Sequence, residues 1–258
     1  AFTISAKDVR ILLKTLLDKG RAPATYNRYL ALVKVIFNRA IEWKIVSSNP
    51  AAYIKLLEEN NERERYLDNT EITRLLHALE HAPANSANAI KLALFTGQRI
   101  GNILSAKRED ISESFWLIPL TKSGKRHRVP LSQEAKDVLS SQGDINAAGN
   151  FIFPGRHGKP HIITVQKIWI KVRKQANLDD VRLHDLRHTF ASCAINSGAT
   201  LFNVQKLLGH SDIKMTQRYA HITDTRQHSI AKNTTANMVA NIADYKKEQA
   251  GYNKKQTA

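Results

Sequence analysis

The sequence predicts a mainly α-helical protein with a small antiparallel β-sheet. Apolar residues recur at helical spacing along most of the 258 residues. Only a few short stretches, near residues 115–118 and 126–131, have the composition of strands. These stretches do not alternate regularly with helices, which argues against a parallel βαβ architecture. With 42% hydrophobic residues, the chain can bury the core of one large domain or of two modest ones.

Three helices are predicted in the first part of the chain. The first begins after Ser5 and ends at Gly20, with apolar residues at helical spacing between them. The second follows Pro23 and continues to Ile41, and the third begins after Pro50, a residue suited to the first turn of a helix. A fully polar stretch follows and indicates a linker. We therefore expect a helical domain over residues 1–60, truncated at its N-terminus, a linker over residues 61–66 and a second domain over residues 67–222.

The second domain is expected to contain helices with a few short strands between them. Its first helix is capped by Asn69 or Thr70, and the next extends from Ala87 to Phe95. After Thr164 the pattern is helical almost throughout. The strands are expected at residues 115–118, 126–131 and 151–153, the later helix breaks at Gly198 and Gly209, and a helix-compatible tail over residues 223–258.

The charge of the chain favours a polyanionic partner. The sequence contains 39 Lys and Arg against 23 Asp and Glu, a formal net charge of +16. Such an excess attracts the phosphate backbone of nucleic acids. A basic but inert surface is the alternative, because net charge ranks partners without identifying one. Nucleic acid is therefore the first candidate partner.

Cysteine content and hydropathy indicate a cytoplasmic protein. The single cysteine, Cys193, excludes an intrachain disulfide and suits a reducing cytosol. The sequence has no uninterrupted apolar stretch of transmembrane length and no signal peptide at its start. We accordingly expect no membrane partner.

The segment His184-Asp185-Leu186-Arg187-His188 carries the most specific chemical signal. His184 and Arg187 are three positions apart, so they share one face of a helix and pair a proton-handling group with a permanent cation, as a phosphate requires. The segment also resembles a His-Glu-x-x-His zinc site, but Asp185 is shorter than glutamate and Arg187 would repel the metal. We therefore expect no metal. The sequence also lacks a Gly-x-x-x-x-Gly-Lys phosphate loop, so we expect no nucleotide cofactor.

Residues of similar chemical character precede and follow this segment. Arg99 comes just after an apolar helix, Lys122 lies on a basic turn between two short strands, and Tyr219 follows His210 by nine positions. In chain order the set resembles the tyrosine recombinase family, the phage integrase type of site-specific DNA recombinase. The resemblance extends from Tyr66 to Ile222 and depends on the ordered set Arg99, Lys122, His184, Arg187, His210 and Tyr219.

The resemblance implies an N-terminal helical core-binding domain and a tyrosine-recombinase catalytic domain that together clamp a DNA duplex. It implies that Tyr219 attacks a phosphodiester to form a phosphotyrosyl link, which conserves the energy of the bond. Arg99 and Arg187 would bind the non-bridging oxygens, because a planar guanidinium matches two phosphate oxygens.

The same resemblance assigns the proton transfers. Lys122 would protonate the leaving 5′ oxygen, with Lys125 as the second choice. His184 would assist proton transfer at the nucleophile, and His210 would hydrogen-bond a phosphate oxygen. His188 is expected to be structural, with its packing and hydrogen bonds inside its own helix.

Other residues are expected to support DNA binding. Many family members carry an acidic residue where this chain has Asn102. The difference bears on how the side chains of the site are positioned, and not on the reaction class. Phosphate contacts that set the register without reading sequence are expected from Lys7, Arg28, Lys34 and Lys44 in the first domain and from Lys125 and Arg126 on the turn.

As a function, the resemblance implies the integration or excision of a prophage or genomic island through a 3′-phosphotyrosyl intermediate and a Holliday junction. The enzyme would be a monomer in solution and a homotetramer on two DNA duplexes, with the tail docking on a neighbouring protomer. Two alternatives remain open: a catalytically silent architectural or regulatory DNA-binding protein of the same fold, and a DNA-relaxing enzyme that uses the same site without strand exchange.

Overall fold

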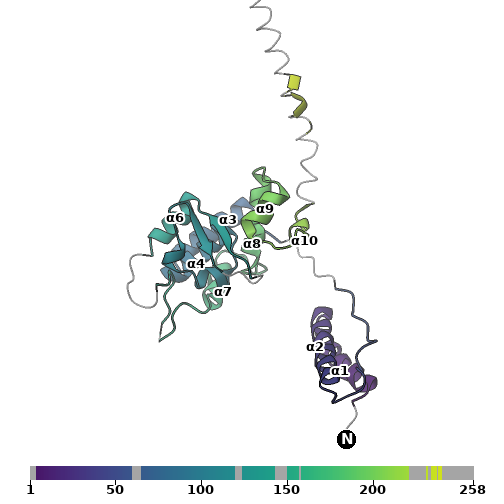
Figure 1. Cartoon of the computed structure of the whole chain (residues 1–258). Helices are drawn as coiled ribbons and strands as arrows, with labels where there is room; N and C mark the ends of the chain where they lie inside the picture. Colours follow the sequence, from purple (N-terminus) through teal and green to yellow (C-terminus); the bar gives the residue numbers. More distant parts are fainter. Residues whose placement is uncertain are drawn as a thin grey trace, which may run out of the picture. The chain divides into compact units, whose positions relative to one another are not determined.

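The computed structural model describes residues 4–59, 65–119, 124–142, 150–156, 158–220, 231, 234–236 and 238–239 (Figure 1). The chain divides into two compact units, Ala1–Arg63 and Glu64–Ala258, which are treated separately below. Most of the tail expected over residues 223–258 lies outside the described residues.

The first unit is a pair of packed helices, α1 (Ala6–Asp18) and α2 (Pro23–Glu42). A capping box begins α1, in which the Ser5 side chain accepts from the Asp8 backbone while the Asp8 side chain accepts from the Ser5 backbone. Pro23 occupies the first position of α2, where its missing N–H leaves no helical bond unmade. Both helices therefore begin and end close to the limits predicted from sequence. Their small core consists of Val9, Leu13, Leu30, Ala51 and Ile54.

The prediction of a third helix after Pro50 is wrong. Residues 50–53 form a turn, and the chain then runs without regular secondary structure to residue 59. Side chains of α2 satisfy the backbone of this segment. The Asn27 amide accepts from the Leu57 N–H and donates to the Leu57 carbonyl, both at 2.8 Å, and Lys34 Nζ donates to the Ile54 carbonyl at 2.9 Å. These long-range bonds replace the ladder of a helix.

Over its described residues the second unit is mainly helical with a small antiparallel sheet, as predicted, and the sheet has two strands. Strand β1 has the predicted limits, and β2 is shorter by one residue at each end. The third strand expected at residues 151–153 is wrong, because Phe151 makes only an isolated bridge to Lys107. In chain order the elements are α3 (Asn69–Glu80), α4 (Ala84–Thr96), α5 (Ile100–Leu104), the 3₁₀ helix η1 (Arg108–Asp110), β1 (Phe115–Ile118), β2 (His127–Pro130), α6 (Gln133–Ser140), α7 (Gln166–Gln175), α8 (Asp185–Asn196), α9 (Leu201–Leu208) and α10 (Lys214–Gln217).

The start of this unit is tied to distant parts of the same unit. Asp68, rather than Asn69 or Thr70, caps α3 through a capping box with Glu71. Arg65 binds Glu71 at 2.7 Å and Asp180 at 2.6 Å, although the sequence suggested a linker up to residue 66. The Leu67 N–H donates to Thr189 Oγ1 on α8 at 3.0 Å. The entry into the unit is thus fixed to the helix that carries the His-Asp-Leu-Arg-His segment.

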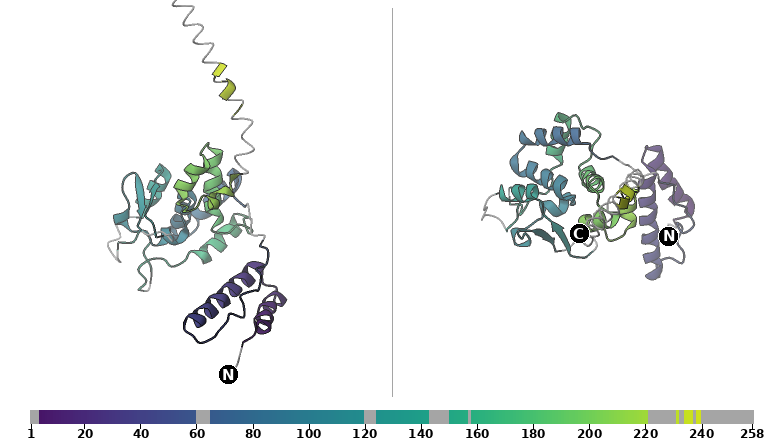
Figure 2. Two further views of the ribbon diagram at one scale, coloured as in Figure 1. Left: turned by 45° about the vertical axis from the view of Figure 1, so that its right-hand side comes forward. Right: turned by 90° about the horizontal axis from the view of Figure 1, so that it is seen from above.

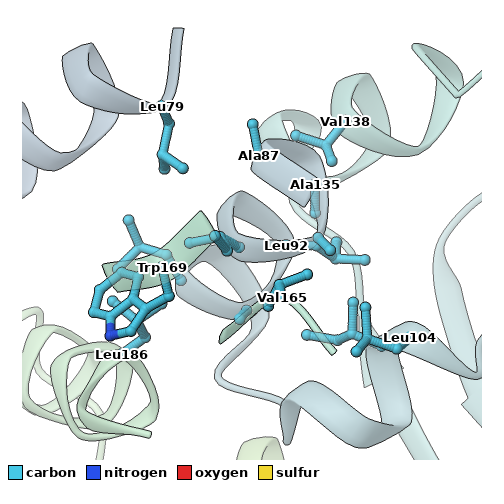
Figure 3. Close-up of a cluster of buried hydrophobic side chains, with 14 of the residues drawn as sticks. Leu79, Ala87, Leu92, Leu104, Ala135, Val138, Val165, Trp169 and Leu186 are labelled. Atoms are coloured by element: carbon cyan, nitrogen blue, oxygen red, sulfur yellow. The ribbon is translucent and has the colours of Figure 1, made fainter. Parts of the chain in front are cut away.

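Helix α4 forms the centre of the main core (Figure 3). It is apolar on most of its circumference and packs against α3, α5, α6, α7 and α8. Trp169 from α7 and Leu186 from α8 are fully buried in the same cluster. Within the described part of the chain, none of the helices combines the length and apolar character that crossing a bilayer requires. A central helix held from so many sides positions its C-terminus rigidly.

The sheet packs against α9 through strand β2. Strands β1 and β2 pair with Trp116 opposite Val129 and Ile118 opposite His127. One face of the hairpin buries Trp116 and Val129 in the core, while Arg128 lies exposed above the Phe115 ring at 3.6 Å from its centroid. Strand β2 packs against α9, and α9 against α8; Figure 2 shows this part from two further sides.

Replacement of Asn27 by alanine is expected to loosen the first unit alone, because it leaves two backbone groups of Leu57 without their partners. The expected cost is about 1–3 kcal/mol. Hydrogen exchange followed by mass spectrometry should show faster exchange in peptides from residues 5–57 and unchanged exchange in peptides from residues 84–96. Asn38→Ala, which removes one exposed bond to Asn49, is the matched control with a much smaller effect. Equal effects of the two variants would contradict this account.

Candidate active site

Arg187 joins the C-terminal ends of two helices. Its two terminal nitrogens donate to the Gly97 carbonyl at the end of α4, at 2.8 Å, and to the Leu208 carbonyl at the end of α9, at 2.9 Å. The residue is only 3% exposed. Carbonyls at a helix C-terminus carry partial negative charge and have no partner within the helix. A cation there is therefore stabilised both by electrostatic attraction and by direct hydrogen bonds. Burial, together with Arg99, lowers the pKa of Arg187 to about 10, which still leaves it charged at neutral pH.

Glycine ends both of these helices for steric reasons. Gly97 has φ +64° and Gly209 has φ +66°, the left-handed conformation that closes a helix. A Cβ atom at Gly97 would lie 2.5 Å from the Phe190 ring and 2.8 Å from Leu208, and one at Gly209 would lie 2.7 Å from the His127 ring. The two helix ends therefore approach their neighbours so closely that a Cβ atom at either glycine would overlap them.

The carbonyl of Leu207 links a third element to this junction. Gln98 Nε2 donates to it at 2.9 Å, and His127 Nε2 of β2 donates to it at 3.1 Å. Desolvation of the ring, followed by the charges of Arg187 and Arg99, lowers the pKa of His127, although its bond to Leu207 acts in the opposite sense. The loop after α4, the strand β2 and the end of α9 are thus fixed relative to one another.

Arg99 adds a second cation beside Arg187. It is half-buried and stands at the N-terminal boundary of the short helix α5, two residues after Gly97. Its charge contributes to the lowered pKa values of Arg187, His184 and His210. The effect requires these groups to be close in space, so the loop after α4 delivers a guanidinium into the same cluster.

Two histidines, four positions apart, lie at the start of α8. His184 stands at the start of the helix with its side chain exposed, and its pKa is lowered first by the protein atoms around the ring and then by Arg187 and Arg99. The His188 ring meets the His184 ring edge-on at 5.3 Å between centroids. Among the described residues, no group of three His, Cys, Asp or Glu side chains is placed to hold a metal ion.

Tyr219 is buried in a small core of its own, and its hydroxyl lies 2.6 Å from Nδ1 of His188. This corrects the expectation that His188 bonds inside its own helix. Burial raises the pKa of Tyr219, against the opposing effect of Arg218 and Arg187, so the hydroxyl is protonated at neutral pH. The ring packs with Ala191, Ile195, Val204 and Leu208 of α8 and α9.

His210 follows Gly209 and faces the same cations. Its Nδ1 atom is hydrogen-bonded to Oγ1 of Thr216 at 2.8 Å, and Thr216 is fully buried. Desolvation, followed by the charges of Arg187 and Arg99, lowers the pKa of His210 to about 3. The ring is therefore neutral at physiological pH, with its Nδ1 atom already engaged.

A basic groove of about 440 Å³ lies beside these residues. The start of β2 and the two residues before it form one wall, and the end of α9 with the loop after it forms the other. Four Lys or Arg side chains reach the groove, and such a surface attracts a polyanion. The lining residues are Lys125, Arg126, His127, Arg128, Gln205, Lys206, Gly209, His210 and Ser211.

Five of the six predicted catalytic residues belong to one cluster: Arg99, His184, Arg187, His210 and Tyr219. The sixth, Lys122, lies outside the described residues. Lys125 and Arg126 line the groove. The four basic residues predicted to bind DNA in the first unit differ in surroundings: Lys7, Arg28 and Lys44 are exposed, whereas Lys34 is half-buried and bound to the Ile54 carbonyl.

Sequence reasoning missed the supporting residues of the cluster. Gln98 and His127 lie inside segments already singled out, so adjacency to Arg99 and to the basic turn was the available signal. The bonds from His188 to Tyr219 and from His210 to Thr216 have no local signature, because they join side chains from separate elements.

The chain is similar in sequence and in fold to known proteins. The model of the phage integrase family matches residues 65–226. The tyrosine recombinase XerD of Oceanobacillus iheyensis is 29% identical over 239 residues, which span 86% of this chain and 80% of the relative. Among solved structures, a dimer of lambda integrase residues 75–356 bound to a COC′ core site has a TM-score of 0.66 at 22% identity, covering 82% of this chain and 81% of that one. A lambda integrase tetramer bound to a Holliday junction has a TM-score of 0.64 at 22% identity, covering 81% and 65%.

Replacement of Gly97 by alanine is expected to destabilise the second unit by at least about 2 kcal/mol, since it combines a left-handed backbone with overpacking against Phe190 and Leu208. Gly101→Ala is the matched control. Gly101 lies in α5 with open space around its Cα, so alanine there should be neutral or stabilising by about 0.5–1 kcal/mol. Urea unfolding followed by fluorescence of the buried Trp116 and Trp169 measures both. Similar stability of the two variants would contradict the close approach of α4 and α9.

Proposed function

The chain belongs to the phage integrase family, and from this premise we propose that it is a site-specific DNA recombinase that cleaves and rejoins DNA through a 3′-phosphotyrosyl intermediate. The observation that carries the proposal is the cluster of Arg99, His184, Arg187, His210 and Tyr219 around the C-terminal ends of α4 and α9. This cluster combines a protonated tyrosine hydroxyl, two guanidinium groups and neutral imidazoles, the groups that transfer of a phosphodiester to a tyrosine requires.

In this proposal Arg187 and Arg99 bind the non-bridging oxygens of the scissile phosphate. A guanidinium has five N–H donors, and the carbonyls of Gly97 and Leu208 engage only two of those on Arg187. Because these bonds hold the guanidinium before DNA arrives, little reorganisation is needed as negative charge builds on the phosphorus centre. Burial strengthens the same interaction, since it excludes competing water.

His210 then acts as a neutral hydrogen-bond donor. If the Thr216 hydroxyl donates to Nδ1, the single ring proton lies on Nε2 and is available to a phosphate oxygen. The low pKa of the ring keeps it in this form at neutral pH. Tyr219 attacks phosphorus, and Lys122 protonates the 5′ oxygen that leaves.

The groove beside the cluster, with Lys125 and Arg126, binds the DNA backbone next to the scissile phosphate. The first unit contributes further phosphate contacts through Lys7, Arg28 and Lys44. We extend the proposal to a homotetramer on two duplexes, which acts in the bacterial cytosol to integrate or excise a prophage or genomic island. The lambda integrase tetramer on a Holliday junction, which shares the fold, supports this assembly.

The wild-type protein is expected to form a covalent adduct with a nicked duplex taken from its flanking genomic DNA. After boiling in detergent, a protein–DNA band should appear with the wild type and be absent with Tyr219→Phe, which lacks the attacking oxygen. Arg99→Gln should lower the rate of adduct formation by on the order of 10²-fold or more. Tight binding without an adduct on every flanking duplex would contradict the proposal and favour an architectural protein.

Lys125→Ala and Arg126→Ala are each expected to weaken DNA binding at low salt. Because each removes one phosphate contact, the slope of log K against log salt concentration should become shallower by about 1. Fluorescence anisotropy between 50 and 200 mM salt, roughly the range in which such slopes are resolved, measures the effect. Lys171→Ala, on α7 and outside the groove, serves as the control and should keep the wild-type slope. Unchanged slopes in both groove variants would place the DNA elsewhere.

A further inference from the structure

We propose that His188, and not His184, accepts the proton of the Tyr219 hydroxyl when the tyrosine attacks DNA. The two side chains are in direct contact, with Nδ1 of His188 and Oη of Tyr219 2.6 Å apart. This distance suits an O–H donor and an imidazole lone pair. The inference rests on the recombinase function proposed above and assigns a proton-transfer role in that reaction to a residue outside the sequence-derived set of six.

The neighbouring groups leave His188 as the acceptor. Arg187 and Arg218, the charged groups that act on Tyr219, are cations and cannot take a proton. His210 already uses its Nδ1 atom in the bond with Thr216. The His184 ring lies against His188, edge to face, so His188 stands next to the tyrosine and His184 next to His188.

The step balances without any further reactant. A neutral His188 carries its proton on Nε2, so its Nδ1 atom accepts a hydrogen bond from the Tyr219 hydroxyl. As the Oη–H bond breaks, the Oη–P bond forms and the P–O5′ bond breaks, and a separate acid protonates the 5′ oxygen. When a 5′ hydroxyl later attacks the phosphotyrosine, the His188 imidazolium returns the proton to Oη.

The electrostatic surroundings couple this step to DNA binding. Burial, followed by Arg218, His184 and Arg187, lowers the pKa of His188 to about 4, and the ring also acts on nearby His210. No carboxylate is among the groups that shift His188 in the described residues. A bound phosphodiester adds a negative charge beside Arg187, which raises the basicity of the ring. His188 is therefore a weak base in the free protein and a stronger one once DNA is in place.

The test uses the nicked duplex that forms the Tyr219 adduct, synthesised with a 5′-bridging sulfur at the scissile phosphate. A thiolate leaves without protonation, so the pH dependence of cleavage reports on the nucleophile alone. The wild-type rate should change little between pH 7 and pH 9. His188→Asn should be slower by on the order of 10²-fold at pH 7 and gain roughly ten-fold per pH unit, because attack then requires the tyrosinate. His184→Asn, the matched variant one helical turn away, should keep the wild-type profile whatever its rate.

Chemical rescue separates a proton acceptor from a structural residue. His188→Ala should regain cleavage in proportion to added imidazole, while DNA affinity stays at the wild-type level. A wild-type profile in the His188 variants, faster cleavage by them, or the steep profile in His184→Asn instead would overturn the inference. Absence of an adduct with the wild type would instead overturn the proposed function, so the two failures are distinct.

Discussion

The site depends on one buried cation held between two helix ends. Arg187 binds carbonyls from α4 and α9 that have no partners within their helices. The carbonyls gain a hydrogen-bond donor, and the buried guanidinium gains two acceptors. Without the guanidinium, the carbonyls of Gly97 and Leu208 would lie buried and unpaired, at a cost of roughly 1–3 kcal/mol each. In the proposed reaction the same bonds also hold the guanidinium in place for the scissile phosphate. Stability and substrate binding would then depend on the same two contacts.

The electrostatic surroundings of Arg187 favour the binding of an anion. Arg99 lies nearby, and the pKa values of His127, His184, His188 and His210 are all lowered, so the histidines add no further positive charge. Two cations as close together as Arg187 and Arg99 repel each other in the free protein, and a bound phosphodiester would relieve that repulsion. In the proposed function, relief of this repulsion contributes to the binding of DNA.

How much the sequence predicts depends on how far apart the interacting residues lie. Helix limits at Ser5 and the strand at residues 115–118 follow from local patterns, and so does the ordered set of polar residues. The third helix of the first unit was wrong because Asn27 binds Leu57 from 30 positions away. The bond between His188 and Tyr219 spans 31 positions and has no sequence signature. Local chemistry is readable from the chain, whereas contacts between elements appear only in the fold.

Tyr219, the proposed nucleophile, is linked to His210 through a single residue, Thr216. Tyr219 lies outside the main core, in a small cluster between α8 and α9, and follows a helix of four residues. Its backbone N–H donates to the Thr216 carbonyl at 3.0 Å, and the Thr216 side chain bonds to His210 at 2.8 Å. In the proposed reaction, a phosphate bound to His210 is therefore connected through Thr216 to the backbone of Tyr219. We expect so short a connection to couple phosphate binding to the alignment of the Tyr219 side chain.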